Sequence, residues 1–490
     1  MTTSDDAARR SRAFSWLAGA LGVAALAAVY VRSPQHALYD SRFALLTSEA
    51  LLTRGSWDLA PLLDDELEED LRRSHAGAEF QRHLWQLEPL PDGRIIYRYP
   101  PGTPLFSLPF VAAARLAGGS TLGADGIYLR DRELRLQALL AALVTALTVL
   151  AVHRLALREL PLGPAATVAL VAGLGSPLWS SASRTLWPHT WTAAWVALAL
   201  LELLRWEDGE RRRPVLLALL VSAAFWSRPT AALVAAPIAI FVALRHRAAR
   251  TRLALTGAAA FAGYLLLAKI LWSSYVPIYA RVLEKGASRR SAWVELYRLL
   301  FSERSGVFVF APILAAVVLA LLVHGIARER RPFAGLALAV VIAHLALYAV
   351  WGMPAGTLGQ RFFAELTPCF AWLGAHAWRR AREAAHGRPR STARRVAAGL
   401  AVGLLATASV AAHAMGALVM RWPNLYAQIR QERRIEARGG PPARTRLVDE
   451  REELPQWRVA RWLVTEWWPG PPPGAYRDPP ARPAPAGVER

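Results

Sequence analysis

Long apolar runs alternate with short polar connectors along most of this chain. The runs are about 15 to 25 residues long, which is the length that a helix needs to cross about 30 Å of hydrocarbon. This pattern predicts an all-α, polytopic membrane protein with about eleven transmembrane helices, because helices satisfy their own backbone hydrogen bonds in lipid. The predicted spans are 14–31, 134–152, 164–181, 188–204, 214–226, 229–244, 253–273, 307–326, 333–351, 363–378 and 396–420.

Three stretches do not fit the spanning pattern. A large first outer loop covers about 32–133, and its apolar piece 105–116 has about a dozen residues and contains Pro109, which favours an interfacial or re-entrant helix. A second outer loop covers about 274–306. Residues 1–420 therefore form one multi-pass domain, and the Pro-rich tail 421–490 is predicted to be extended and to lie outside the cell or in the periplasm.

The distribution of arginine predicts the orientation of the spans. Short cytoplasmic loops of membrane proteins carry an excess of Lys and Arg. If the N-terminus is cytoplasmic and each predicted span crosses the membrane once, every dense arginine cluster lies on the cytoplasmic side. The short loops on the opposite side then carry only Arg184, Arg228 and Arg361. The second outer loop, which is also basic, is the exception. We therefore expect an integral protein of a bacterial-type inner or plasma membrane. The clusters are 154–158, 205–213, 245–252, 328–331 and 379–395.

Composition narrows the class of protein further. A net charge of +21 could indicate a nucleic-acid partner, but the arginines lie in connectors between apolar runs, so we expect no nucleic-acid binding. Cys369 is the single cysteine, which excludes an intrachain disulfide. The segment 14–31 follows three arginines, as a signal peptide would, but it lacks a small-residue cleavage site and is predicted to be a retained first helix.

Asp40 is the first candidate for chemistry. It lies soon after the first span, directly before a helix-like run that ends near Leu52. On one interpretation it is the N-cap of that helix, since Asp is a favoured cap. On the other it is a general base at the membrane interface, where partial desolvation favours proton uptake by a carboxylate. The pattern of residues 40–52 leaves both interpretations open.

Four outer-face arginines at span ends are candidates for binding a phosphate. Arg135, Arg184, Arg228 and Arg361 could extend toward lipid headgroups, or their guanidinium groups could hold a phosphate through bidentate hydrogen bonds. Arg228 lies between two apolar segments, where ionisable residues are rare and usually functional. Convergence of several such groups from different helices would favour the phosphate interpretation.

His189 and an acidic run could bind other groups. His189 follows Trp187-Pro188 at the start of a span and could ligate a metal or donate to a phosphate, although a structural role is also open. The run 64–70, which is Asp-Asp-Glu-Leu-Glu-Glu-Asp, could hold a divalent cation or could be a solvated loop. A divalent cation therefore stays an open expectation, and no metal ligand is assigned.

Several short motifs, taken together, resemble the GT-C superfamily of glycosyltransferases, which includes protein O-mannosyltransferases and lipid A aminoarabinose transferases. The likeness covers about 14–378 as a pattern of spans and loops. The motifs are Asp40 after the first span, Tyr99-Pro100-Pro101-Gly102-Thr103-Pro104-Leu105, the 132–135 entry to the second span, Ser227-Arg228-Pro229-Thr230 and Gly359-Gln360-Arg361-Phe362-Phe363.

This resemblance implies an inverting enzyme that moves a hexose or pentose from a polyprenyl-phosphate donor to a glycan, lipid or protein acceptor on the outer face. It implies that Asp40 is the catalytic base and that Arg228 and Arg361 hold the carrier phosphate. The sequence departs from some relatives, because Ser41 stands where a second acid is often found. The full set of expected substrate-binding residues is Arg42, Tyr97, Arg98, Tyr99, Arg135, Arg184, His189, Arg228 and Arg361.

Two other functions compete with the transferase. A lipid flippase or transporter could use the same arginines along a translocation path, and it would often show paired, interrupted segments. A non-catalytic membrane scaffold could use the large outer loop as a docking surface. Separation of Asp40, Arg228 and Arg361 in the structure would favour the scaffold.

Overall fold

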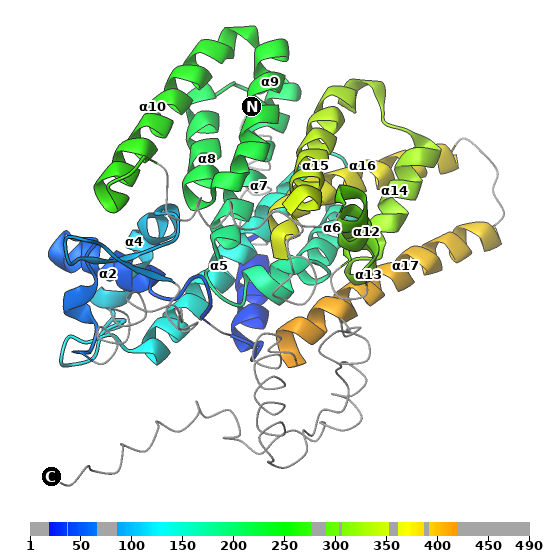
Figure 1. Ribbon diagram of the computed structural model, residues 1–490. Helices are drawn as coiled ribbons and strands as arrows, with labels where there is room; N and C mark the ends of the chain where they lie inside the picture. Colours follow the sequence, from blue (N-terminus) through cyan, green and yellow to red (C-terminus); the bar gives the residue numbers. More distant parts are fainter. Residues whose placement is uncertain are drawn as a thin grey trace, which may run out of the picture. The chain divides into compact units, whose positions relative to one another are not determined.

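The computed structural model describes residues 19–36, 38–65, 86–275, 291–302, 306–351, 361–386 and 392–419, and it is mostly helical (Figure 1). Within the described residues, each predicted span falls on one helix or on two successive helical segments. The principal helices are the first helix Gly19–Arg32, α5 Arg130–Ala156, α6 Leu162–Leu174, α7 Pro188–Glu207, α8 Pro214–Ser227, α9 Ala232–Arg245, α10 Arg247–Trp272, α12 Ala292–Phe301, α13 Val307–Phe310, α14 Ile313–His324, α15 Arg331–Trp351, α16 Thr367–His386 and α17 Thr392–Ala414.

Four helical segments of the described residues are long and apolar enough to cross a membrane. Other predicted spans form apolar helices of 10–17 residues, among them α6, α8, α9 and α14. The helical fold class is thus confirmed, whereas the number of about eleven spans stays a prediction. The four long segments are Arg130–Ala156, Arg247–Trp272, Arg328–Trp351 and Thr392–Leu418.

The predicted break inside residues 214–244 is confirmed. Helix α8 ends at Ser227, and Arg228 has extended backbone angles of φ −157° and ψ 115° before helical structure resumes at Pro229. A residue that precedes proline is biased away from the helical region, and proline itself is tolerated in a first helical turn. The Ser-Arg-Pro sequence therefore ends one helix and starts the next locally.

The first outer loop folds as a small unit beside the bundle. It contains α2 (Ala44–Arg54), an antiparallel hairpin of β1 (Leu87–Pro89) and β2 (Ile95–Tyr97), and α4 (Gly102–Leu116). Apolar side chains of α2 and the hairpin form a common core, and α4 packs along α2. Helix α4 is the predicted interfacial helix 105–116, extended by three residues at its start.

The carboxylate that caps helix α2 belongs to Glu133 of α5, and not to Asp40. Helix α2 begins at Ala44, so its N-cap is Phe43 and not Asp40. The backbone N–H groups of Phe43 and Leu45 donate to Glu133 at 2.9 and 3.0 Å. Glu133 thereby satisfies two of the donors that are unpaired at a helix start. The N-cap interpretation of Asp40 is wrong, because the cap comes from a distant helix.

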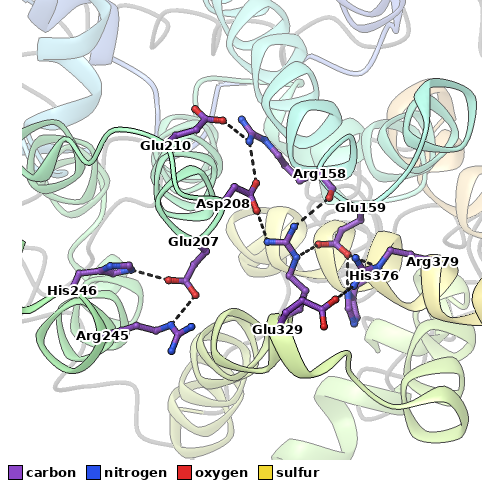
Figure 2. Close-up of polar contacts among 11 residues, drawn as sticks. Arg158, Glu159, Glu207, Asp208, Glu210, Arg245, His246, Glu329, His376 and Arg379 are labelled. Atoms are coloured by element: carbon purple, nitrogen blue, oxygen red, sulfur yellow. Dashed lines mark hydrogen bonds and ion pairs between the residues drawn. The ribbon is translucent and has the colours of Figure 1, made fainter.

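The connectors that were predicted to share one side meet at one end of the bundle (Figure 2). Glu159, after α5, forms ion pairs with Arg330 at 2.9 Å and with Arg379 at 3.1 Å. Arg330 also pairs with Asp208, after α7, at 2.7 Å. Arg158 pairs with the same Asp208 at 3.0 Å, so arginines of three basic clusters lie within one charged network. The orientation of the spans stays a prediction.

Candidate functional site

Asp40 and Arg361 face each other at the start of a short 3-10 helix, η5 (Arg361–Leu366). Asp40 Oδ2 lies 3.5 Å from Arg361 Nη2, and the two side chains keep 21% and 17% of their surface exposed. The Arg361 guanidinium lies 4.4 Å above the Trp187 ring and 5.0 Å above the Phe362 ring. Aromatic faces attract a guanidinium, so these two rings fix the orientation of Arg361. Tyr39 stacks on Trp187 at 5.3 Å.

Polar contacts on both sides hold the backbone around Asp40. Gln137, on α5, donates to the Ser41 carbonyl at 2.7 Å and accepts from the Thr185 hydroxyl at 2.9 Å. The Ser41 and Thr185 hydroxyls also lie 2.6 Å apart, and the Tyr97 hydroxyl donates to the Asp40 carbonyl. These bonds join the outer loop, α5 and the segment before α7. Asp40 is therefore presented from a firmly held backbone, as a positioned base requires.

A buried ion pair lies behind this surface. Arg228 Nη1 lies 2.6 Å from Glu365 Oε1 and 3.1 Å from the Tyr348 hydroxyl, and Arg228 and Glu365 are almost completely buried. His344 Nε2 is 3.4 Å and His189 Nδ1 is 4.0 Å from the same carboxylate. Because Glu365 belongs to η5, this pair anchors the helix that starts with Arg361. The Arg228 guanidinium also lies 5.0 Å from the Phe362 ring.

Three residues of this buried cluster were missed by reasoning from the sequence. They are Glu365, His344 and Tyr348. Glu365 offered a usable signal, because it is a lone acid inside a predicted span, and intramembrane ionisable residues are usually paired. Its partner Arg228 lies 137 residues earlier in the chain, so nothing local could identify the pair.

The Tyr-Pro-Pro-Gly motif packs against the Ser-Arg-Pro motif. Gly102, at the start of α4, lies so close to Trp226 and Ser227 that an added Cβ would come within 3.0 Å of their backbone atoms. Any residue other than glycine would push the loop away from the end of α8. Two motifs that were noted separately in the sequence are therefore in direct contact, beside Arg228.

Arg184 and Arg42 are used within the protein. The Arg184 side chain is buried and donates to the carbonyls of Tyr30 and Ser33, where the first helix ends. It thereby satisfies carbonyls that a helix end leaves unpaired. The Arg42 guanidinium lies 4.6 Å from the Phe43 ring, on the core of the outer loop.

The remaining candidate residues are Tyr99, Arg98 and Arg135. Tyr99 packs on Tyr97 with ring centroids 5.6 Å apart, and Tyr97 is the residue whose hydroxyl bonds to the Asp40 carbonyl. Arg98 lies 3.8 Å from Glu88 across the hairpin. Arg135 is exposed on α5, and no contact of its side chain with these residues occurs in the described ranges.

The acidic run 64–70 is the stretch that the sequence offers for binding a divalent cation. Most of the run 64–70 lies outside the described residues, which include only Asp64 and Asp65. Within the described ranges, no group of three or more His, Cys, Asp or Glu side chains is placed to hold a metal ion. The expected divalent cation therefore has no assigned ligands.

The site combines the partly exposed carboxylate of Asp40, the partly exposed guanidinium of Arg361 and the aromatic rings of Trp187 and Phe362. A carboxylate can accept a proton from a hydroxyl, and a guanidinium can neutralise a phosphate that departs. Arg361 and Arg228 each lie 5.0 Å from the Phe362 ring, and Asp40 lies 3.5 Å from Arg361, so the three candidate residues are close together. No protein-family model, curated protein or solved structure matches this chain.

Proposed function

We propose that this protein is an inverting membrane glycosyltransferase that moves a sugar from a polyprenyl-phosphate donor to a hydroxyl of a glycan, lipid or protein acceptor. The observation that supports the proposal is the partly exposed ion pair of Asp40 and Arg361, in which the Arg361 guanidinium lies over the Trp187 ring. The resemblance of the same residues to GT-C motifs supports it independently.

The proposed reaction is a direct displacement. Asp40 takes the proton of the acceptor hydroxyl as its oxygen bonds to the anomeric carbon, and the bond from that carbon to the phosphate oxygen breaks. The electron pair leaves with polyprenyl phosphate, whose negative charge Arg361 stabilises. The donor phosphate competes with Asp40 for Arg361, so donor binding weakens the ion pair between the base and this arginine. Arg228 supports this indirectly, because it holds Glu365 and therefore η5.

The proposed topology places this site on the outer face. With eleven spans and a cytoplasmic N-terminus, the charged network of Figure 2 lies on the cytoplasmic side. The ends of α5 and α7 belong to that network, whereas the start of α7 carries Trp187 and His189 beside the site. A helix that crosses once separates the two. The bilayer and an isoprenoid lipid donor are therefore the proposed partners.

The decisive experiment compares Asp40→Asn with Asp92→Asn. Asp92 is another carboxylate of the outer loop that pairs with an arginine, Arg94, at 2.7 Å, but it is more exposed and lies in the hairpin turn. Purified protein in liposomes would receive synthetic polyprenyl-phosphate hexoses and pentoses with an extract of outer-face glycans and lipids, and released polyprenyl phosphate would be measured.

We expect Asp40→Asn to reduce release about 10²- to 10⁴-fold, which is the usual contribution of a general base, and Asp92→Asn to leave it unchanged. Retained turnover in Asp40→Asn would remove this residue from the mechanism. Transbilayer movement of the labelled donor without acceptor, together with no release by the wild type, would instead identify a lipid transporter.

A further inference from the structure

A second feature lies outside the proposed catalytic site, between helices α8, α9 and α10. These three helices stand side by side in Figure 1, and a cavity of about 850 Å³ lies between them. This volume is within the range of about 300–1,000 Å³ that is typical of ligand sites. Alanine, glycine and larger apolar residues form most of its lining, and none of the proposed site residues takes part in it.

Aromatic side chains line one end of the cavity. The Trp226 indole N–H donates to the Ala260 carbonyl at 3.2 Å, which joins the end of α8 to α10. Phe225 packs edge-on against Phe261 and Tyr264, with ring centroids 5.7 and 5.1 Å away. This end lies at the end of α8, next to the break at Arg228, which does not line the cavity.

A single charged residue lines the opposite end. Arg250 is exposed, and it forms no ion pair with the other residues that the structure describes. The neighbouring Thr251 also lines the cavity and can donate from its hydroxyl. A guanidinium with free donors is suited to a phosphate group. The cavity therefore has an apolar interior, aromatic side chains at one end and a cation at the other.

The length of the cavity matches one leaflet of a bilayer. Arg250 and Phe261 are eleven residues apart on α10. At 1.5 Å per residue they are about 16 Å apart along the helix. Half of the hydrocarbon core of a bilayer is about 15 Å thick. An acyl chain whose headgroup lies at Arg250 would therefore end near the aromatic rings, whereas a much longer isoprenoid chain would not fit inside.

We propose that the cavity between α8, α9 and α10 binds one anionic phospholipid, with its phosphate at Arg250 and its acyl chain in the apolar interior. The lipid belongs to the leaflet at the end of the bundle where α10 begins. The inference goes beyond the proposed function, because it concerns a lipid that is neither donor nor acceptor. It fills space between helices that otherwise leave a cavity, and so it contributes to their packing.

The test measures phospholipid binding and does not depend on transferase activity. Purified full-length protein in detergent would be titrated with phosphatidylglycerol or phosphatidylcholine, and bound lipid would be counted by native mass spectrometry. We expect one tightly bound phosphatidylglycerol and a preference of at least 10-fold over phosphatidylcholine. Arg250→Gln should abolish this preference. Arg252→Gln, which changes an exposed arginine of the same helix that does not line the cavity, should retain it.

A second variant tests the interior. Gly257 lines the cavity, and an added Cβ there would meet no atom within 4 Å, so Gly257→Leu should fold and fill the space. We expect it to lose the bound lipid. Gly335→Leu on α15 also projects into open space and should keep the lipid. Equal losses in both leucine variants or both glutamine variants, equal binding of the two phospholipids, or displacement by stoichiometric polyprenyl phosphate would overturn the proposal.

Discussion

The buried pair of Arg228 and Glu365 allows a quantitative test of the packing behind the candidate site. Arg228 is 2% exposed and Glu365 is 0% exposed, and their charged atoms are 2.6 Å apart. Removing one member of a buried pair leaves an uncompensated charge in the interior, and this typically costs about 3–5 kcal/mol. We therefore expect Glu365→Gln and Arg228→Met each to lower the free energy of unfolding by about that amount.

The double variant Arg228→Met/Glu365→Leu separates the effect of an unpaired buried charge on stability from the effect of changed packing. Both charges are then absent, and hydrophobic replacement of a buried pair is often neutral. We expect the double variant to be more stable than either single variant, although His344 and Tyr348 lose a neighbour. Denaturant titration in mixed micelles would measure the three free energies. Losses below about 1 kcal/mol for both single variants, or additive losses in the double variant, would refute the reasoning.

Three further predictions concern the loop and the exposed arginine. Gly102→Ala should lower stability by about 1–3 kcal/mol through overpacking against α8, whereas Gly163→Ala in open space should not, and thermal unfolding would measure both. Glu133→Ala should destabilise the outer loop by about 1–3 kcal/mol, because buried donors at the start of α2 lose their acceptor, and amide hydrogen exchange of α2 would increase. Arg361→Lys should reduce transfer at least 10-fold through loss of its stacked, planar geometry, whereas Arg94→Lys should not, and unchanged release of polyprenyl phosphate by the former would contradict the assigned role.

The candidate site was partly predictable from the sequence. Asp40 and Arg361 were selected by their positions at the ends of apolar runs, and the structure places them 3.5 Å apart. Arg228 was selected in the same way, but its partner Glu365 was not. The difference is physical, because an arginine between two apolar segments is visible locally, whereas the acid that compensates it is chosen by how α8 and η5 pack.

The sequence by itself determined the helices, the break at Arg228 and the grouping of the basic connectors. These features depend on residues that are near in the chain: apolar runs favour helices, proline limits the conformation before it, and arginine collects in connectors.

Only the tertiary structure decided which polar groups serve the fold and which stay accessible. Glu133 caps a helix that begins about 90 residues earlier, and Arg184 binds the end of the first helix about 150 residues away. Such contacts depend on the angles and registers at which helices pack, and no local pattern encodes them. The same packing leaves Asp40 and Arg361 accessible and opens the cavity at Arg250.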